Sequence, residues 1–214
     1  MNLDRSQIVM CDTETTGLDP DRHQIWEVGV IHWVPVVVPP GHSPRLQRVE
    51  KRWFLPVDLT TADTMALRIG RFHERHPNGV HFPRSWSPNP QAVVGITPLE
   101  KFAREFVQIT DGKHLVGAVI SFDDQRLSKL LRAAGQPLTA HYHSLEIEAM
   151  VYGFLSHRMP DLDIPLPFKS DDLSDLLGVD RSGFEEHTAL GDCRWVEAQL
   201  LAMEDITRNA AAAI

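Results

Sequence analysis

"CDTETTGLDP" (residues 11–20) sets two carboxylates, Asp12 and Glu14, directly behind an apolar run at positions 8–10. The apolar run predicts a buried strand that ends near Thr13. Because alternate side chains of a strand point to the same face, Asp12 and Glu14 share one face, about 6 to 7 Å apart. Two like charges held this close need either open solvent or a compensating cation. A hard divalent ion such as Mg²⁺ or Mn²⁺ suits carboxylate oxygens, so the stretch predicts a metal site at the end of a strand.

The composition is that of an ordinary folded domain. Of the 214 residues, 43% are hydrophobic and 23% are charged, which argues against disorder, coiled coil and collagen-like repeats. A chain of this length buries one well-formed core, so we expect a single domain over residues 1–214. The two cysteines, Cys11 and Cys193, imply no disulfide framework and are expected to be small buried hydrophobic residues.

Two further properties of the chain bear on its location and partners. Residues 1–9 contain no basic segment followed by an apolar stretch, and no run approaches the roughly 18 apolar residues that span a membrane. We therefore expect a cytoplasmic protein with no membrane partner. The net charge of −8 counts against a nucleic-acid partner, because phosphate binding usually comes with a basic surplus.

The order of the expected elements indicates the fold class. The pattern of apolar and turn residues predicts strands at 8–13, 25–34, 48–56, 114–121 and 140–147. It predicts helices at 62–75, 97–109, 123–135, 148–157 and 171–178, and a last helix from about Thr188. Strands that alternate with helices are typical of an α/β fold, here a five-stranded mixed sheet flanked by helices. The tryptophans expected in the core are Trp26, Trp33, Trp53 and Trp195.

Two proline-rich segments interrupt this pattern as loop insertions, near residues 35–47 and 77–97. The first contains too many prolines for a central strand, so we expect an extended loop or an excursion at the sheet edge. The second is long for a loop inside one domain. It fits either a functional segment, with Trp86 as a candidate substrate contact, or an insertion without a role.

More carboxylates that suit the metal site occur later in the chain. Asp123 in "SFDDQRL" lies where a predicted strand gives way to a helix, a place from which side chains reach into a cleft. Asp192 in "EHTALGDCRW" lies inside the predicted last helix, five residues after His187. Residues five apart do not share a helical face, so His187 is expected to project from the loop before that helix.

Taken in order, the motifs D-x-E-T-T-G-L, F-D and H-x-A-L-x-D resemble those of the DEDD 3′-to-5′ exonuclease superfamily. The histidine five residues before the last aspartate is similar to the H-x-x-x-x-D subgroup, which includes proofreading subunits of DNA polymerases, RNase T and oligoribonuclease. The resemblance extends from position 12 to position 192 and implies an RNase H-like fold. It also implies the metal ligands and the general base of the site: two Mg²⁺ or Mn²⁺ ions on Asp12, Glu14, Asp123 and Asp192, with His187 as the base.

The resemblance further implies an activity and a partner. The activity is divalent-metal-dependent hydrolysis of single-stranded DNA or RNA from the 3′ end, by a two-metal mechanism that releases nucleoside 5′-monophosphates. The partner is a nucleic acid with a free 3′ end. Two divalent ions offset the roughly −4 charge of four ligand carboxylates, so the loaded site attracts phosphate although the whole chain is acidic.

The same resemblance implies which residues contact the substrate. Thr15, Gly17 and Leu18 correspond to the stretch that contacts the 3′-terminal nucleotide, and Phe122 is a candidate for base stacking. One departure is that Ala118 and Val119 stand where family members often carry a His-Asn pair.

Two other classes of protein compete with this interpretation. In the first, "DTETT" holds an aspartyl-phosphate nucleophile, but such phosphatases use D-x-D-x-T and Glu14 breaks that pattern. The second is a non-catalytic nucleic-acid-binding module of the same fold. The presence of all four carboxylates and of His187 counts against it.

Overall fold

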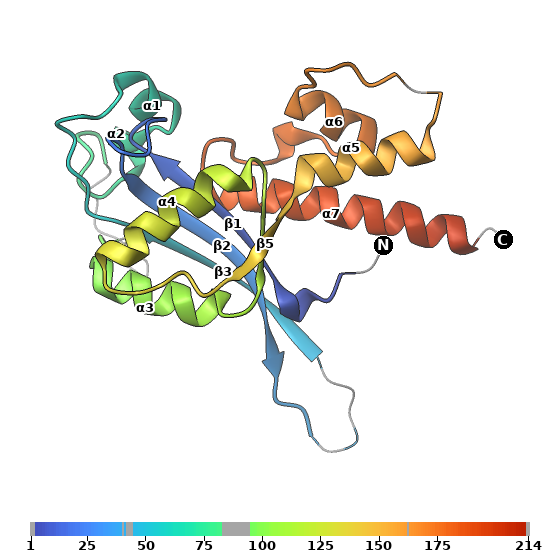
Figure 1. Ribbon diagram of the computed structural model, residues 1–214, viewed down its shortest axis with the longest axis horizontal. Coiled ribbons are helices and arrows are strands. Elements are labelled where there is room, and N and C mark those ends of the chain that lie inside the picture. The colour runs from blue at the N-terminus through green and yellow to red at the C-terminus, as the bar shows by residue number, and fades with distance from the viewer. Residues whose placement is uncertain (1–2, 40, 42–44, 83–94, 162, 213–214) are drawn as a thin grey trace.

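The computed structural model describes residues 3–39, 41, 45–82, 95–161 and 163–212 (Figure 1). Its strands are β1 (Ile8–Thr15), β2 (Ile25–Val36), β3 (Arg45–Phe54), β4 (His114–Gly117) and β5 (His141–Glu146). Its α-helices are α1 (Thr64–Ile69), α2 (Phe72–Arg75), α3 (Leu99–Thr110), α4 (Ile120–Ala133), α5 (Ile147–Arg158), α6 (Ser170–Leu177) and α7 (Ala189–Ala212). Single 3₁₀ turns occur at Arg5–Gln7 and Arg181–Gly183.

The five strands form one mixed sheet in the order β3-β2-β1-β4-β5, which confirms the predicted fold class. The first three strands pair antiparallel, whereas β4 and β5 run parallel to β1. β1 is therefore the central strand, and its residues 8–11 are buried on both faces. The two carboxylates of β1 follow this buried run at the end of the strand.

Helices cover both faces of the sheet (Figure 1). On one face α3 and α4 pack on β1 and β2, through Phe102, Phe106, Leu127 and Leu131. On the other face α5, α6 and α7 enclose a second core that includes Ile147, Leu173, Trp195 and Leu200. The four tryptophans expected in the core are buried, and so are Cys11 and Cys193, which are free thiols. No helix in the described part of the chain is long and apolar enough to cross a membrane.

The expected helix at 62–75 is wrong in one respect, because the structure divides it into α1 and α2. Asp63 caps α1 by accepting hydrogen bonds from the amides of Met65 and Ala66, at 2.7 and 3.3 Å. The break follows Gly70, and Arg71 adopts a left-handed backbone with φ 51°. A left-handed residue reverses the chain direction, so it ends the helix.

Other boundaries also differ from the predictions. The strand expected at 114–121 ends at Gly117, because Val119 is left-handed (φ 54°) and α4 starts at Ile120. The strand expected at 25–34 continues through Pro35 to Val36, paired with the first residues of β3. β1 pairs with β2 only as far as His32, so Pro35 lies on a free edge where a missing N–H is tolerated. Trp86 and most of the 77–97 loop lie outside the described residues.

α7 lies directly against the sheet at Gly29 of β2. A β-carbon on Gly29 would be 2.5 Å from the carbonyl carbon of Ala189 and 2.8 Å from the amide nitrogen of Leu190. The Cys193 thiol also donates to the carbonyl oxygen of Gly29 at 3.4 Å. Gly29 pairs with Asp12 in the sheet register, so this close approach brings the start of α7 next to the β1 carboxylates.

We expect Gly29→Ala to destabilise the protein by about 1–3 kcal/mol, because the new methyl group overlaps backbone atoms that cannot rotate away. Denaturant unfolding measures this change. Gly153→Ala is the matched control, since Gly153 is exposed within α5 and its added methyl group meets open space. The control should stabilise by about 0.5–1 kcal/mol, as expected for a helical glycine. Equal behaviour of the two variants would contradict the close packing at Gly29.

Candidate metal-binding active site

Three of the four predicted ligands lie together. Asp12, Glu14 and Asp192 each offer a carboxylate oxygen within 4.8 Å of those of the other two, and all three side chains are partly buried. Asp12 and Glu14 come from the end of β1, on the face that α7 covers, and Asp192 comes from the first turn of α7. The docking of α7 on Gly29 thus closes a three-carboxylate group at the edge of the helix layer.

Burial makes the negative charge of this group unfavourable. The pKa of Asp12 is raised well above its ordinary value, first by burial and then by the nearby charges of Asp123, Asp192 and Glu14. Burial, with the charge of Glu27 next, raises the pKa of Glu14 to about 8. Without a cation Glu14 would hold a proton near neutral pH. Three converging carboxylates are the donor set that a hard divalent ion prefers, so the residues fit Mg²⁺ or Mn²⁺.

Asp192 has cationic neighbours of its own. Its pKa is raised by burial, and the charges of Arg181 and His187 oppose that rise. The Arg181 Nη2 atom lies 3.8 Å from Asp192 Oδ1, and its guanidinium stacks 4.5 Å from the ring centre of Trp195. Arg181 was not a predicted site residue, and it provides a positive charge next to Asp192.

The fourth predicted ligand, Asp123, is not one of the three residues whose carboxylate oxygens lie within 4.8 Å of one another. It belongs to the first turn of α4, which covers the opposite face of the sheet, and it accepts a 2.5 Å hydrogen bond from the Thr13 hydroxyl. Only 3% of Asp123 is exposed, and burial raises its pKa to about 7. Its charge still acts on Asp12, so it lies near the group while its oxygen is held by Thr13.

His187 lies in the loop two residues before α7 and is exposed. Its backbone is left-handed, with φ 54°, which is uncommon for a residue with a β-carbon. The next residue, Thr188, accepts from the Asp192 amide at 2.9 Å, so the loop and the carboxylate belong to one tight turn. The structure therefore places the His187 backbone directly beside the metal-ligand candidate Asp192.

The predicted substrate contacts line one cavity of about 300 Å³ that also includes Glu14. This volume is at the low end of the range for small-molecule sites. Thr15, Gly17, Leu18 and Phe122 form one side, and α1 supplies the other. Sequence reasoning missed the α1 side, whose members are Asp63, Met65, Ala66, Ile69 and Gly70. Leu18, Met65 and Ile69 are 79%, 55% and 49% exposed, so they present apolar surface to whatever enters the cavity.

α4 holds the loop that carries Leu18. Buried Arg126 donates to the Leu18 carbonyl oxygen and to the Phe122 carbonyl oxygen, and its guanidinium lies 3.3 Å from the centre of the Phe122 ring. Gly17 has a φ of 153°, and a β-carbon there would be 2.4 Å from the His23 ring. The need for glycine at this position is therefore explained by the packing of its own loop.

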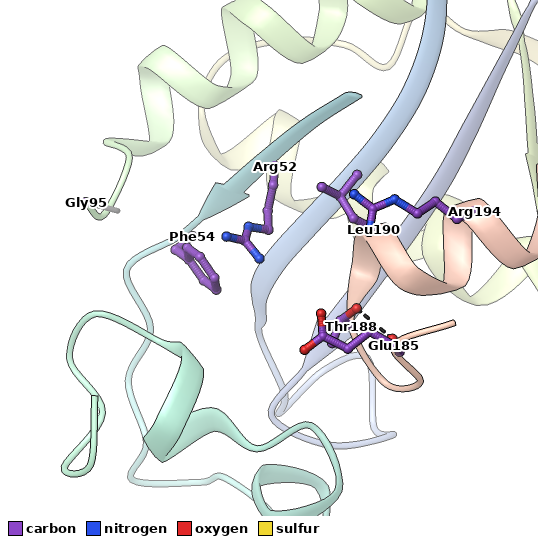
Figure 2. A pocket seen from close by; sticks show the side chains of 7 residues that line it. All are labelled: Arg52, Phe54, Gly95, Glu185, Thr188, Leu190 and Arg194. Carbon is purple, nitrogen blue, oxygen red and sulfur yellow. Dashed lines mark hydrogen bonds between the residues drawn. The ribbon is translucent and has the colours of Figure 1, made fainter. Parts of the chain in front are cut away.

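A second cavity, of about 550 Å³, lies between β3 and the start of α7 (Figure 2). Its lining residues are Arg52, Phe54, Gly95, Glu185, Thr188, Leu190 and Arg194. Most of its positive charge is neutralised, because Arg194 binds Glu50 at 2.9 and 2.5 Å and Arg52 faces Glu27 at 4.0 Å. None of the predicted site residues lines it, so the smaller cavity at Glu14 is the better candidate for the active site.

No protein-family model and no curated protein matches this chain. Solved structures do match it. The zinc-bound complex of E. coli exonuclease I with single-stranded DNA is 15% identical, with a TM-score of 0.62 over 96% of this chain and 41% of that chain. The complex of the same enzyme with a dT13 oligonucleotide is 15% identical, with a TM-score of 0.56 over 91% of this chain and 40% of that chain.

These matches establish the fold, which is the RNase H-like fold of exonuclease I. They agree with the resemblance to the DEDD superfamily at the level of architecture. The chain spans about two fifths of the length of the exonuclease I chains that it matches. The activity and the roles of the site residues therefore depend on the geometry of the site.

We expect the metal-free protein to lose stability as the pH rises from about 4.5 to about 8. In that window folded Glu14, with its pKa raised from 4.5 to about 8, keeps a proton that the unfolded chain releases. Mg²⁺ favours the charged form, so it should raise the melting temperature more at pH 8 than at pH 5. At a concentration about 100 times its Kd the ion would contribute about 2.7 kcal/mol.

Thermal melts in EDTA and in Mg²⁺ at both pH values measure these effects. Glu14→Gln should weaken the pH dependence and the response to Mg²⁺, because it removes the buried charge. Asp175→Asn, an exposed change in α6, serves as the control and should leave both unchanged. An equal Mg²⁺ response in wild-type and Glu14→Gln protein would exclude Glu14 as a ligand.

Proposed function

We propose that this protein is a divalent-metal-dependent 3′-to-5′ exonuclease that removes nucleoside 5′-monophosphates from single-stranded DNA or RNA. The observation that carries the proposal is that Glu14 belongs both to the three-carboxylate group and to the lining of the small cavity. A ligand in the cavity would therefore lie beside the metal-ligand candidates. The fold shared with exonuclease I supports this function by analogy.

The cavity suits the terminal unit of a nucleic-acid strand. It combines the apolar side chains of Leu18, Met65 and Ile69 with the half-buried Phe122 ring, and such surfaces bind the faces of bases without selecting among them. The Thr15 hydroxyl is held by the Gly17 carbonyl oxygen at 2.9 Å, at the base of the same loop. A cavity of about 300 Å³ has room for about one nucleotide, which is compatible with the binding of a terminal unit.

The carboxylates and the histidine have separate roles in this proposal. Asp12, Glu14 and Asp192 would hold one divalent ion, and Asp123, near Asp12, would complete a site for a second. Divalent ions bound there supply charge neutralisation for the scissile phosphate and lower the pKa of water. His187 would take the proton from the attacking water, and its exposed position leaves the imidazole accessible from solvent.

The partner is a strand with a free 3′ end, and an acidic surface is compatible with it. The net charge of −8 predicts modest affinity that depends on the bound metal, since the loaded site offsets the carboxylate charge where the phosphate lies. The complexes of exonuclease I are with single-stranded DNA and a dT13 oligonucleotide, which makes single strands the first substrates to test.

We expect the purified protein with Mg²⁺ or Mn²⁺ to shorten 5′-labelled single strands one nucleotide at a time, and EDTA to stop the reaction. A gel assay on matched DNA, RNA and duplexes with a recessed 3′ end measures the ladder and ranks the substrates. Asp12→Asn should abolish cleavage while Asp175→Asn retains it. Internal cuts, or unchanged cleavage by Asp12→Asn, would overturn the proposed function.

A further inference from the structure

One largely buried arginine joins three parts of the candidate site. Arg75, the last residue of α2, donates through Nη1 to the carbonyl oxygens of Gly70 and His187, at 2.7 and 2.6 Å. Its Nη2 atom donates to the carboxylate of Glu27 on β2. The guanidinium also lies 5.1 Å from the centre of the Trp26 ring. Only 10% of the side chain is exposed, so these contacts hold it in one orientation.

The hydrogen bond from Arg75 holds His187 in an unfavourable backbone conformation. His187 has a φ of 54°, a conformation that residues with a β-carbon rarely adopt. Two other bonds stiffen the loop from the α7 side: the Thr188 hydroxyl donates to the Glu185 carbonyl oxygen at 2.7 Å (Figure 2), and the Gly191 amide donates to that hydroxyl at 3.0 Å. Arg75 fixes the His187 carbonyl itself from a different element.

The second carbonyl oxygen that accepts from Arg75 Nη1 belongs to Gly70, in the wall of the small cavity at Glu14. Gly70 ends α1 and lines the cavity, and a β-carbon there would be 3.2 Å from Glu14 Oε2 and 3.0 Å from the Trp26 ring. Arg75 therefore joins the cavity wall beside Glu14 to the loop that carries His187. Glu27 has no exposed surface and pairs with Glu14 across the β1–β2 register, so it directs the guanidinium from beneath the site.

We propose that Arg75 is a positioning residue for His187, and this inference rests on the proposed function. By holding the His187 carbonyl oxygen, the guanidinium fixes the backbone of His187 and with it the direction in which the imidazole leaves the chain. Its second bond places the cavity wall at a fixed distance from the same loop. The planar fork of arginine can meet these three acceptors at once, whereas the single ammonium of lysine cannot match the geometry.

Steady-state kinetics on a single-stranded oligonucleotide test this role through a double-mutant cycle. His187→Ala should lower kcat by about 10² to 10⁴. Arg75→Met should lower kcat by about 10- to 100-fold and change KM less, because the carboxylates and the apolar side chains of the cavity remain while the bonds to His187 and Gly70 are lost. In the His187→Ala background Arg75→Met should cause no further loss, since the base that it positions is absent.

Further variants separate positioning from folding. Arg75→Met leaves buried Glu27 with only the 4.0 Å contact to Arg52, so the double variant Arg75→Met/Glu27→Gln removes both charges of the lost pair and should show the same loss of kcat. Arg75→Lys keeps a positive charge beside Glu27 and should restore the melting temperature more fully than kcat. Arg68→Met in α1 is the matched control, and neither its kcat nor its melting temperature should change.

The outcomes distinguish the inference from the proposed function. If the wild-type protein cleaves and His187→Ala is impaired, equal fractional losses from Arg75→Met in both backgrounds would assign Arg75 a structural role and overturn the inference alone. Unchanged kcat in the folded Arg75→Met/Glu27→Gln variant would also overturn it. Absence of cleavage by the wild-type protein would instead overturn the proposed function, on which the inference depends.

Discussion

The crowding of negative charge at the end of β1 is the constraint to which the rest of the site responds. Asp12, Glu14 and Asp192 converge to within 4.8 Å while partly buried, and burial raises the pKa of each. A fold does not gain stability from such an arrangement, because buried like charges are costly without a cation. The group therefore suits a bound cation, which would offset the charge of the three carboxylates.

The surrounding structure holds this group in place by backbone contacts. The lack of a side chain at Gly29 lets α7 approach β2, which brings Asp192 to β1. Arg126 holds the Leu18 loop from α4, and Arg75 holds the His187 loop from α2, in each case by donating to carbonyl oxygens. Such bonds fix the backbone and leave the neighbouring side chains free for ligands. The site thus combines a rigid frame with exposed groups at its opening.

The sequence predicted the sheet, because the patterns that mark strands and helices are local. The resemblance to the DEDD motifs predicted that four carboxylates converge, and the structure brings three of them together, Asp12, Glu14 and Asp192. It did not predict the bond between Thr13 and Asp123, which joins elements 110 residues apart on the other face of β1. It also did not predict that α1 lines the small cavity. One continuous helix was expected over residues 62–75, whereas left-handed Arg71 divides that helix into α1 and α2. The side chains of Arg75 and Arg126 donate to backbone carbonyl oxygens of distant loops. No sequence pattern marks such a contact, because every residue has a carbonyl oxygen.

Anomalous X-ray diffraction from crystals grown with Mn²⁺ tests the central claim most directly. The account predicts a manganese peak enclosed by carboxylate oxygens of Asp12, Glu14 and Asp192, and its loss in crystals of Asp12→Asn. A structure in which millimolar Mn²⁺ leaves these carboxylates without a peak, or places the ion elsewhere, would contradict it.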